Sequence, residues 1–205
     1  ALVVTDGEGV ERFGPWATMP YPPALKARVL SVLGGRGDVA GAAEAITRRH
    51  ADAVESILEE NDLTTGQIDV IGFHGQTILH RPEEGRTWQI GDGALLARLT
   101  GIDVVDDFRA ADVAAGGEGA PLASLYHQAL ARTLERPLAV LNIGGVANVT
   151  WIGADDRLIA FDTGPGNALV DDWVRRWGGA EMDLGGAIAG QGRIDQDRLT
   201  AMLAH

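Results

Sequence analysis

The spacing of apolar and polar positions divides the chain into short strands and amphipathic helices. The clearest helix covers residues 39–60, where apolar residues recur every three to four positions after a candidate N-cap, Asp38. The charged residues on its other face indicate either a docking surface or an ordinary solvated face. Short apolar runs bounded by glycine, proline or charged residues predict strands. The expected strands are 1–5, 10–18, 68–73, 88–90, 102–105, 138–143, 146–152 and 158–161, and the remaining expected helices are 23–33, 91–99, 122–134, 168–177 and 193–204.

The order of these elements predicts the fold class and the domains. Strands and helices alternate up to residue 134, and a β-meander followed by a helix begins after Pro137. This order predicts an α/β protein with two lobes, residues 1–136 and 137–205, and a cleft between two lobes is a natural ligand site. The chain starts inside a predicted strand and stops inside a predicted helix, so we expect both lobes to be incomplete.

Charge and composition exclude several classes of protein. A formal net charge of −12 argues against general binding to a nucleic-acid backbone, and the absence of cysteine excludes disulfides, thiolate nucleophiles and cysteine-bound zinc. No apolar run approaches the roughly 18 residues of a membrane span, and the first residues lack the basic region of a signal peptide. An acidic protein that binds a nucleotide needs backbone N–H groups, helix N-termini or a metal ion beside the phosphates.

Glycine is over-represented, and its positions mark loops. The 28 glycines are roughly twice the usual share of about 7%, and they gather at 72–93, 116–119, 144–166 and 178–192. Clusters of this kind indicate several functional loops in one cleft, because a backbone without side chains can approach a ligand closely.

The stretch 138–167 holds the densest of these patterns. Gly144 and Gly145 separate two predicted strands, and a third strand delivers Asp162 into a glycine-bearing loop. Backbone N–H groups at such turns can cradle phosphate oxygens, so strand, turn and carboxylate together fit a cleft for a nucleotide and a sugar. The alternative is a β-meander whose glycines only make tight turns, because short glycine motifs often match by chance.

Polar side chains also follow two strands of the first lobe. His74 and Gln76 come directly after the strand 68–73, where ligand groups gather in open α/β sheets. They are therefore candidates for hydrogen bonds to a substrate, although His74 could instead hold its own turn together. Asp92 is expected to cap the helix that follows it rather than to bind a ligand.

A denser polar cluster follows the strand 102–105. Asp107, Arg109 and Asp112 lie within a few residues of one another, just before the glycine loop 116–119. Such a cluster either binds a metal or sugar hydroxyls, or forms an Arg–Asp brace that shapes the loop. The adjacent glycine loop favours the functional alternative.

Four segments together resemble one known family. IGFHGQTILHRP, TWQIGDGALLARLTGIDVVDDFRAADVAAGGEGAPL, VLNIGGVANVT and FDTGPGNALVDDW, at their spacings here, resemble the anhydro-N-acetylmuramic acid kinases, and the likeness runs from Ala1 to the last helix. Those enzymes belong to the superfamily of sugar kinases, Hsp70 and actin. The resemblance implies two RNase-H-like α/β lobes around a nucleotide cleft.

The resemblance also implies a reaction and its residues. ATP and Mg²⁺ are used to phosphorylate O6 of 1,6-anhydro-N-acetylmuramic acid while water opens the anhydro bridge, a step of peptidoglycan recycling in the cytoplasm. Asp162 matches the aspartate that activates the water, and the family suggests a homodimer. The nucleotide-binding residues implied are Asn142, Gly144 and Gly145, with Asn148 expected to help Asn142 hold the turn. The substrate-binding residues implied are His74, Gln76, Asp107, Arg109, Asp112, Thr163, Gly164, Pro165, Gly166 and Asn167.

The sequence departs from the family pattern at its two ends. It starts just after the place of a GTSxDGxD-type phosphate loop, and it stops before an adenosine-binding glycine motif and a late substrate-contacting glutamate. We therefore expect the 205-residue chain alone to be inactive or very weak, and its metal ligands cannot be assigned. The alternatives are a non-catalytic sugar-sensing or partner-binding module of the same fold, and a related exopolyphosphatase-like phosphohydrolase, which would not be expected to carry HGQT or DTGPGN.

Overall fold

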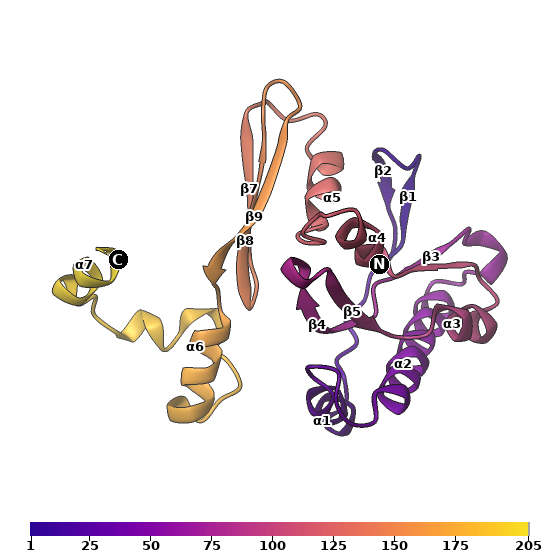
Figure 1. Ribbon diagram of the computed structural model, residues 1–205, viewed down its shortest axis with the longest axis horizontal. Coiled ribbons are helices and arrows are strands. Elements are labelled where there is room, and N and C mark those ends of the chain that lie inside the picture. The colour runs from indigo at the N-terminus through magenta and orange to yellow at the C-terminus, as the bar shows by residue number, and fades with distance from the viewer. Residues whose placement is uncertain (205) are drawn as a thin grey trace. The chain divides into compact units, whose positions relative to one another are not determined.

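The computed structural model describes residues 1–204 and divides them into two compact units (Figure 1). The first unit is Ala1–Leu134, and the second begins at Glu135. His205, the last residue of the predicted second lobe, lies outside the described residues. Each unit is described below by itself.

The first unit combines three two-stranded sheets with five α-helices over its described residues. Strand β3 pairs with β6 in parallel, whereas β1 pairs with β2 and β4 pairs with β5 in antiparallel fashion. The strands are β1 (Val3–Thr5), β2 (Val10–Phe13), β3 (Ile71–Phe73), β4 (Gln76–Arg81), β5 (Arg86–Ile90) and β6 (Val104–Asp106). The helices are α1 (Pro23–Ser31), α2 (Val39–Glu60), α3 (Gly93–Thr100), α4 (Phe108–Ala114) and α5 (Ala123–Leu130).

Helix α2 forms where the sequence predicts it and carries much of this unit's core. The Asp38 side chain accepts a hydrogen bond from the Gly41 backbone N–H, which satisfies one of the free donors at the helix start. The Arg28 guanidinium, together with that N–H, holds the pKa of the Asp38 carboxyl below its usual value. The apolar face of α2 buries Ile46 completely, in a cluster that also contains Phe73, Ile78, Ile90 and Leu96.

A buried hydroxyl connects α2 to the start of α3. Thr47 is fully buried, and its Oγ1 donates to the Ala43 carbonyl oxygen while it accepts from the Asp92 backbone N–H at 3.0 Å. The Asp92 side chain in turn caps α3 by accepting from the Leu95 N–H at 2.7 Å. The predicted capping role of Asp92 is therefore confirmed, and Thr47 fixes where the loop before α3 lies.

This connection yields a stability prediction. Thr47→Val keeps the shape of the side chain but leaves the Asp92 N–H without its partly buried acceptor, so we expect the free energy of unfolding to fall by about 1 kcal/mol. Urea denaturation measures the change. Thr47→Ser keeps the hydroxyl and loses only a methyl group, so it should cost less. A Val variant as stable as the wild type would show that the hydroxyl contributes nothing.

The second unit is built on a three-stranded antiparallel sheet in the order β7-β8-β9. One face of the sheet buries Thr150 and Ile152 of β8, whereas Leu141 and Phe161 on the other face are more than half exposed. The elements are β7 (Leu138–Ile143), β8 (Val146–Ile152), β9 (Leu158–Pro165), α6 (Ala168–Trp173), a π-helical turn (Val174–Gly178) and α7 (Gln196–Leu203).

Several predictions of local structure were wrong. Strand β4 and helix α4 form where loops were expected, and β9 continues through Pro165 although a loop was expected from Asp162 onward. Trp173 and Trp177 lie four residues apart, a spacing that predicts that both face the core, but they are 56% and 71% exposed. Helical spacing places two side chains on one face, and it does not say what covers that face.

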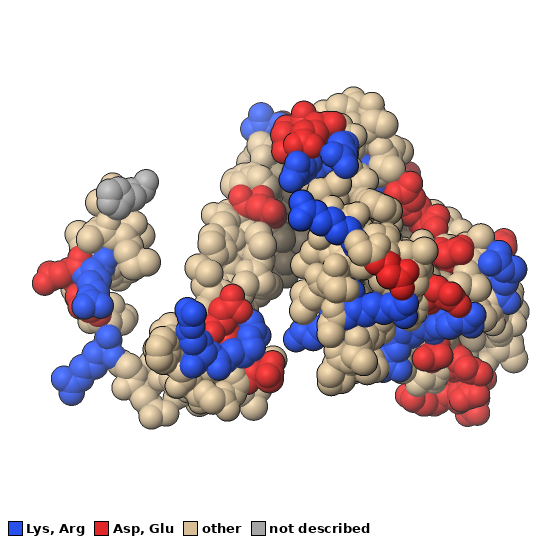
Figure 2. All heavy atoms as spheres, turned by 60° about the horizontal axis from the view of Figure 1, so that its bottom comes forward, with Lys and Arg blue, Asp and Glu red and all other residues tan. Residues whose placement is uncertain are grey.

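Some of the charged side chains form ion pairs on the surface. Figure 2 shows basic side chains next to acidic ones on the visible face. The ion pairs of the described residues include Arg48 with Glu44 and Arg28 with Asp38. The charges on α2 therefore include ordinary surface ion pairs. None of the described helices is both long enough and apolar enough to cross a membrane.

Candidate functional site

The parallel pairing of β3 with β6 brings two of the predicted polar segments together. Phe73 at the end of β3 lies opposite Asp106 at the end of β6, so His74 and Asp107 follow at the same edge. A cavity of about 340 Å³ lies here, and we call it the His74 cavity. Its lining residues are Phe73, His74, Gly75, Thr87, Trp88, Gln89, Ile90, Gly91, Asp106, Asp107 and Ala110.

Arg109 holds His74 at the cavity wall. The Arg109 Nε–H donates to His74 Nε2 at 3.0 Å, and its Nη1 donates to the Gly119 carbonyl oxygen at 2.8 Å. Because Nε2 accepts, the ring proton lies on Nδ1, which is 2.9 Å from the Gly75 carbonyl oxygen and donates to it. The imidazole is thus fixed in one orientation by the adjacent Gly75 and by Arg109, which is 35 residues away from His74 in sequence.

The two aspartates of the polar cluster play different structural roles. Asp107 stands before α4 with a left-handed backbone, φ 54°, and its side chain caps nothing, so its carboxylate is exposed at the cavity. Asp112 instead accepts from the Gly119 N–H at 2.6 Å and packs against Gly117, where a side chain would collide with the carboxylate. Asp112 and Arg109 each bond to the backbone of Gly119 and so help to fix the glycine loop.

Gln76 is separated from this group. It begins β4, and its amide lies 3.4 Å from the Thr77 carbonyl oxygen, outside the residues that line the His74 cavity. Two lining residues that the sequence did not single out are Trp88 and Gln89. A polar residue between two apolar ones in the short run Trp88–Ile90 was the available signal, and it looked like ordinary strand alternation.

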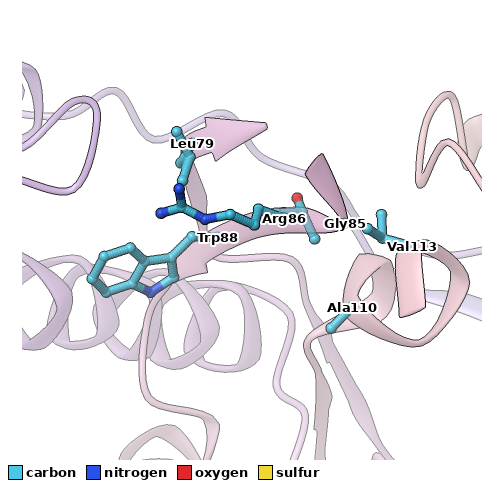
Figure 3. Close-up of a pocket in the computed structure, with 7 residues that line it drawn as sticks. Leu79, Gly85, Arg86, Trp88, Ala110 and Val113 are labelled. Atoms are coloured by element: carbon cyan, nitrogen blue, oxygen red, sulfur yellow. The ribbon is translucent and has the colours of Figure 1, made fainter. Parts of the chain in front are cut away.

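A second, smaller hollow adjoins the first (Figure 3). It measures about 250 Å³ and shares Thr87, Trp88 and Ala110 with the His74 cavity. In Figure 3 the side chains of Arg86 and Leu79 lie on the strand side, and Ala110 and Val113 of α4 lie across from them. The two hollows together follow the surface between β5 and α4.

In the second unit, the glycine turn between β7 and β8 is joined to the end of β9. The Gly166 N–H donates to the Gly145 carbonyl oxygen at 2.9 Å, and the Asn167 N–H donates to the Gly144 carbonyl oxygen at 2.7 Å. The Asn167 side chain also donates to the Ile143 carbonyl oxygen at 3.3 Å. Gly144, Gly145, Gly166 and Asn167 therefore form one structural group.

The glycines of this group differ in how much room their surroundings leave for a side chain. A side chain at Gly166 would press against the Gly144 carbonyl oxygen, so close packing requires a glycine there. At Gly144 and Gly145 a Cβ would make only ordinary contacts, at 3.5 and 3.7 Å. Packing therefore does not demand glycine at these two positions.

Asp162 ends a row of polar residues across the sheet. Asn142 of β7 lies opposite Asn148 of β8, and Asn148 lies opposite Asp162 of β9, so all three share one face near the glycine turn. Directly opposed residues have Cβ atoms about 5 Å apart, within reach of one another. Asp162 is exposed and does not point into a hydrophobic interior, so a substrate can reach its carboxylate.

The two asparagines do not hold the glycine turn in the way that was expected. Within the described residues, backbone hydrogen bonds and Asn167 hold the turn, and the Asn148 Oδ1 is buried without a partner. Thr163 donates to the Ala147 carbonyl oxygen at 3.2 Å, which fixes β9 to β8, while Gly164 and Pro165 pair with the first residues of β8.

The fit of a divalent cation can be judged from the available carboxylates. Among the described residues, no group of three or more histidine or acidic side chains is arranged around a common point. Magnesium in kinases is usually held by one or two carboxylates together with substrate phosphates and water. The described residues thus do not define a protein cage for the ion.

An α/β fold with a carboxylate beside a glycine turn is compatible with a nucleotide-handling protein. A family model described as anhydro-N-acetylmuramic acid kinase matches residues 1–205. Proteins of that name from Paramagnetospirillum magneticum and Rhodospirillum rubrum are each 54% identical to the whole chain, and one from Acidiphilium cryptum is 50% identical over 99% of it. The chain spans 58%, 56% and 57% of these relatives' lengths, respectively.

The chain belongs to the anhydro-N-acetylmuramic acid kinase family. This family is part of the superfamily of sugar kinases and actin-like ATPases, so the predicted α/β class is confirmed. The roles of individual residues are not given by that membership, and they are argued below from their geometry.

Proposed function

We propose that the complete protein is an ATP-dependent kinase that opens 1,6-anhydro-N-acetylmuramic acid with water and phosphorylates its O6. The product is N-acetylmuramic acid 6-phosphate, an intermediate of peptidoglycan recycling. Family membership supports the substrate class, because the relatives that match the whole chain carry this name. The observation that carries the mechanism is the exposed carboxylate of Asp162, in register with two asparagines beside the glycine turn.

Asp162 acts as the general base in this proposal. Its carboxylate takes a proton from water as the water oxygen attacks the anomeric carbon, C1. The C1–O6 bond breaks, its electron pair goes to O6, and O6 attacks the γ-phosphorus of ATP, so that ADP leaves. The oxygen that leaves C1 is therefore the oxygen that accepts the phosphoryl group. One positioned carboxylate serves the first half of the reaction, the attack of water on C1. The second half, phosphoryl transfer to O6, depends mainly on positioning and electrostatics.

Different residues are proposed to bind the nucleotide and the sugar. Gly144, Gly145 and Asn142 are proposed to contact the nucleotide, because the turn offers backbone that no side chain covers. His74 and Asp107, with Arg109 behind His74, are proposed to bind the sugar through the His74 cavity. Thr163, Gly164, Pro165, Gly166 and Asn167 continue the sugar site from Asp162, while Gln76 and Asp112 contribute by shaping the surrounding backbone.

Further properties of the complete protein are proposed on the same basis. The two compact units are proposed to belong to the two lobes of a sugar kinase that uses ATP and Mg²⁺. The family suggests a homodimer in the cytoplasm that binds neither nucleic acid nor membranes, and the acidic net charge of −12 agrees with the absence of nucleic acid. Light scattering of the purified complete protein measures the oligomeric state.

The direct test is an assay of the complete protein with the anhydro sugar, ATP and Mg²⁺. We expect ADP and N-acetylmuramic acid 6-phosphate in a ratio of one to one, identified by chromatography and mass spectrometry. ADP formed without a phosphorylated sugar would indicate a phosphohydrolase. Sugar binding without any turnover would indicate a sensing module and would contradict the proposed function.

A further inference from the structure

Gln89 lines the His74 cavity, and its amide is held in a defined orientation. It lies opposite Thr77 in the β4–β5 pair, next to the buried Ile90. Its Nε2 donates to Thr77 Oγ1 at 3.1 Å and to Thr87 Oγ1 at 2.9 Å, so both amide hydrogens have acceptors. Gln89 therefore braces β4 against β5 through its nitrogen.

The neighbouring groups support this orientation of the amide. Thr87 Oγ1 lies 3.0 Å from His80 Nδ1, so its hydroxyl proton can go to the ring nitrogen while its oxygen accepts from Gln89. If the amide were turned over, its oxygen would face Thr87. It would then compete with His80 Nδ1 for the single hydroxyl proton of Thr87. The nitrogen is thus directed at the two threonines, and the oxygen is directed elsewhere.

The amide oxygen is the part that lacks a partner. Within the described residues, Gln89 Oε1 is shielded from solvent and accepts no hydrogen bond, although its residue lines a cavity. A buried acceptor without a donor costs free energy, and natural structures rarely keep one without a reason. Because Gln89 lines the His74 cavity, a ligand in that cavity with its own N–H or O–H group is suited to supply the missing donor.

We propose that Gln89 is a specificity-determining residue, whose Oε1 accepts a hydrogen bond from a neutral donor of the bound sugar. The donor is either the N–H of the acetamido group or a ring hydroxyl, and both belong to the substrate class in the proposed function on which this inference rests. Because the oxygen cannot turn away without breaking the bonds to the threonines, a sugar without that donor leaves the acceptor unpaired. The site then rejects such a sugar, as sites built around hydrogen bonds do.

The test pairs a change in the protein with a change in the sugar. Wild-type complete protein and Gln89→Leu are titrated calorimetrically with 1,6-anhydro-N-acetylmuramic acid, with an analogue lacking the acetamido group, and with an analogue lacking the free ring hydroxyl. We expect Gln89→Leu to weaken binding of the parent sugar about tenfold. For one of the two analogues, wild type and variant should bind equally within about twofold, and that analogue identifies the donor.

Two control variants separate recognition from bracing. Thr77→Val keeps Oε1 but removes one hydroxyl that orients the amide, so it should weaken the sugars that carry the donor, by less than Gln89→Leu does, and should leave the analogue without the donor unchanged. Gln89→Asn keeps an amide on a side chain that is one methylene shorter. It replaces Gln89→Leu in the titrations if the Leu variant does not fold.

The outcomes are distinguishable. If Gln89→Leu weakens all three sugars equally, or weakens none, the specificity role of Gln89 is overturned while the proposed function stands. If the wild-type protein binds none of the three sugars, both the proposed function and the proposed role of Gln89 are overturned.

Discussion

Asp162→Asn in the complete protein is expected to lower kcat by about 100-fold or more, because an amide cannot take a proton from water. The change removes one charge and keeps the shape of the side chain, so the pairing of β9 with β8 should survive. Substrate binding should change little, and the loss should appear in kcat rather than in KM. Steady-state kinetics of ADP release, measured with the anhydro sugar, tests this.

A second carboxylate in the same unit provides the control. Asp172 of α6 forms a surface ion pair with Arg175 of the π-helical turn, and exposed pairs of this kind contribute little to stability. Asp172→Asn should therefore keep kcat within about twofold, by the same argument. Activity of Asp162→Asn within about tenfold of the wild type would reject Asp162 as the base.

Gly166→Ala is expected to have the next largest effect. The added methyl group would press against the Gly144 carbonyl oxygen and approach the Ala147 nitrogen to 3.3 Å, so the glycine turn and the end of β9 must move apart. Overpacking of this kind costs about 1–3 kcal/mol of stability. Displacement of a reacting group by about 1 Å can lower catalysis about 100-fold. We expect kcat/KM for ATP to fall by at least tenfold.

A glycine elsewhere in the same unit serves as the matched control. Gly190 has no atom within 4 Å of the place where a side chain would start, so Gly190→Ala should leave both kinetics and thermal unfolding unchanged. If Gly166→Ala behaves like Gly190→Ala, the contact between the turn and the end of β9 is not needed for activity.

Local signals predicted several elements closely. Helix α2 begins and ends where its periodicity and its cap Asp38 place it, because both signals lie within the helix itself. The turn at Gly144 between β7 and β8 was also predicted, since two apolar runs of strand length flank it.

Elements that depend on distant partners were less predictable. Strand β4, QTILHR, has no clean alternation of apolar and polar residues, and its pairing with β5 defines it as a strand. Strand β9 extends through Pro165 because it pairs with β8 on one side only, and an edge strand tolerates proline. Neither property can be derived from the residues of the strand itself.

In the candidate site, too, some features follow from the sequence and others depend on contacts between distant residues. The proximity of His74 to Asp107 follows from the sequence once β3 and β6 are taken as parallel strands. The bond from Arg109 to His74 and the unpartnered oxygen of Gln89 depend on side-chain geometry that no spacing encodes. A buried acceptor becomes visible only when every neighbouring donor has been placed.

The central claim is that water attacks C1 while the bridging oxygen takes the phosphoryl group, and isotope labelling tests it most directly. The complete protein is incubated with the anhydro sugar and ATP in water enriched in ¹⁸O, and the product is analysed by mass spectrometry immediately after quenching. We predict one ¹⁸O atom in the C1 hydroxyl group and none in the phosphate ester. Label in the phosphate, or a product whose anhydro bridge is intact, would contradict the account.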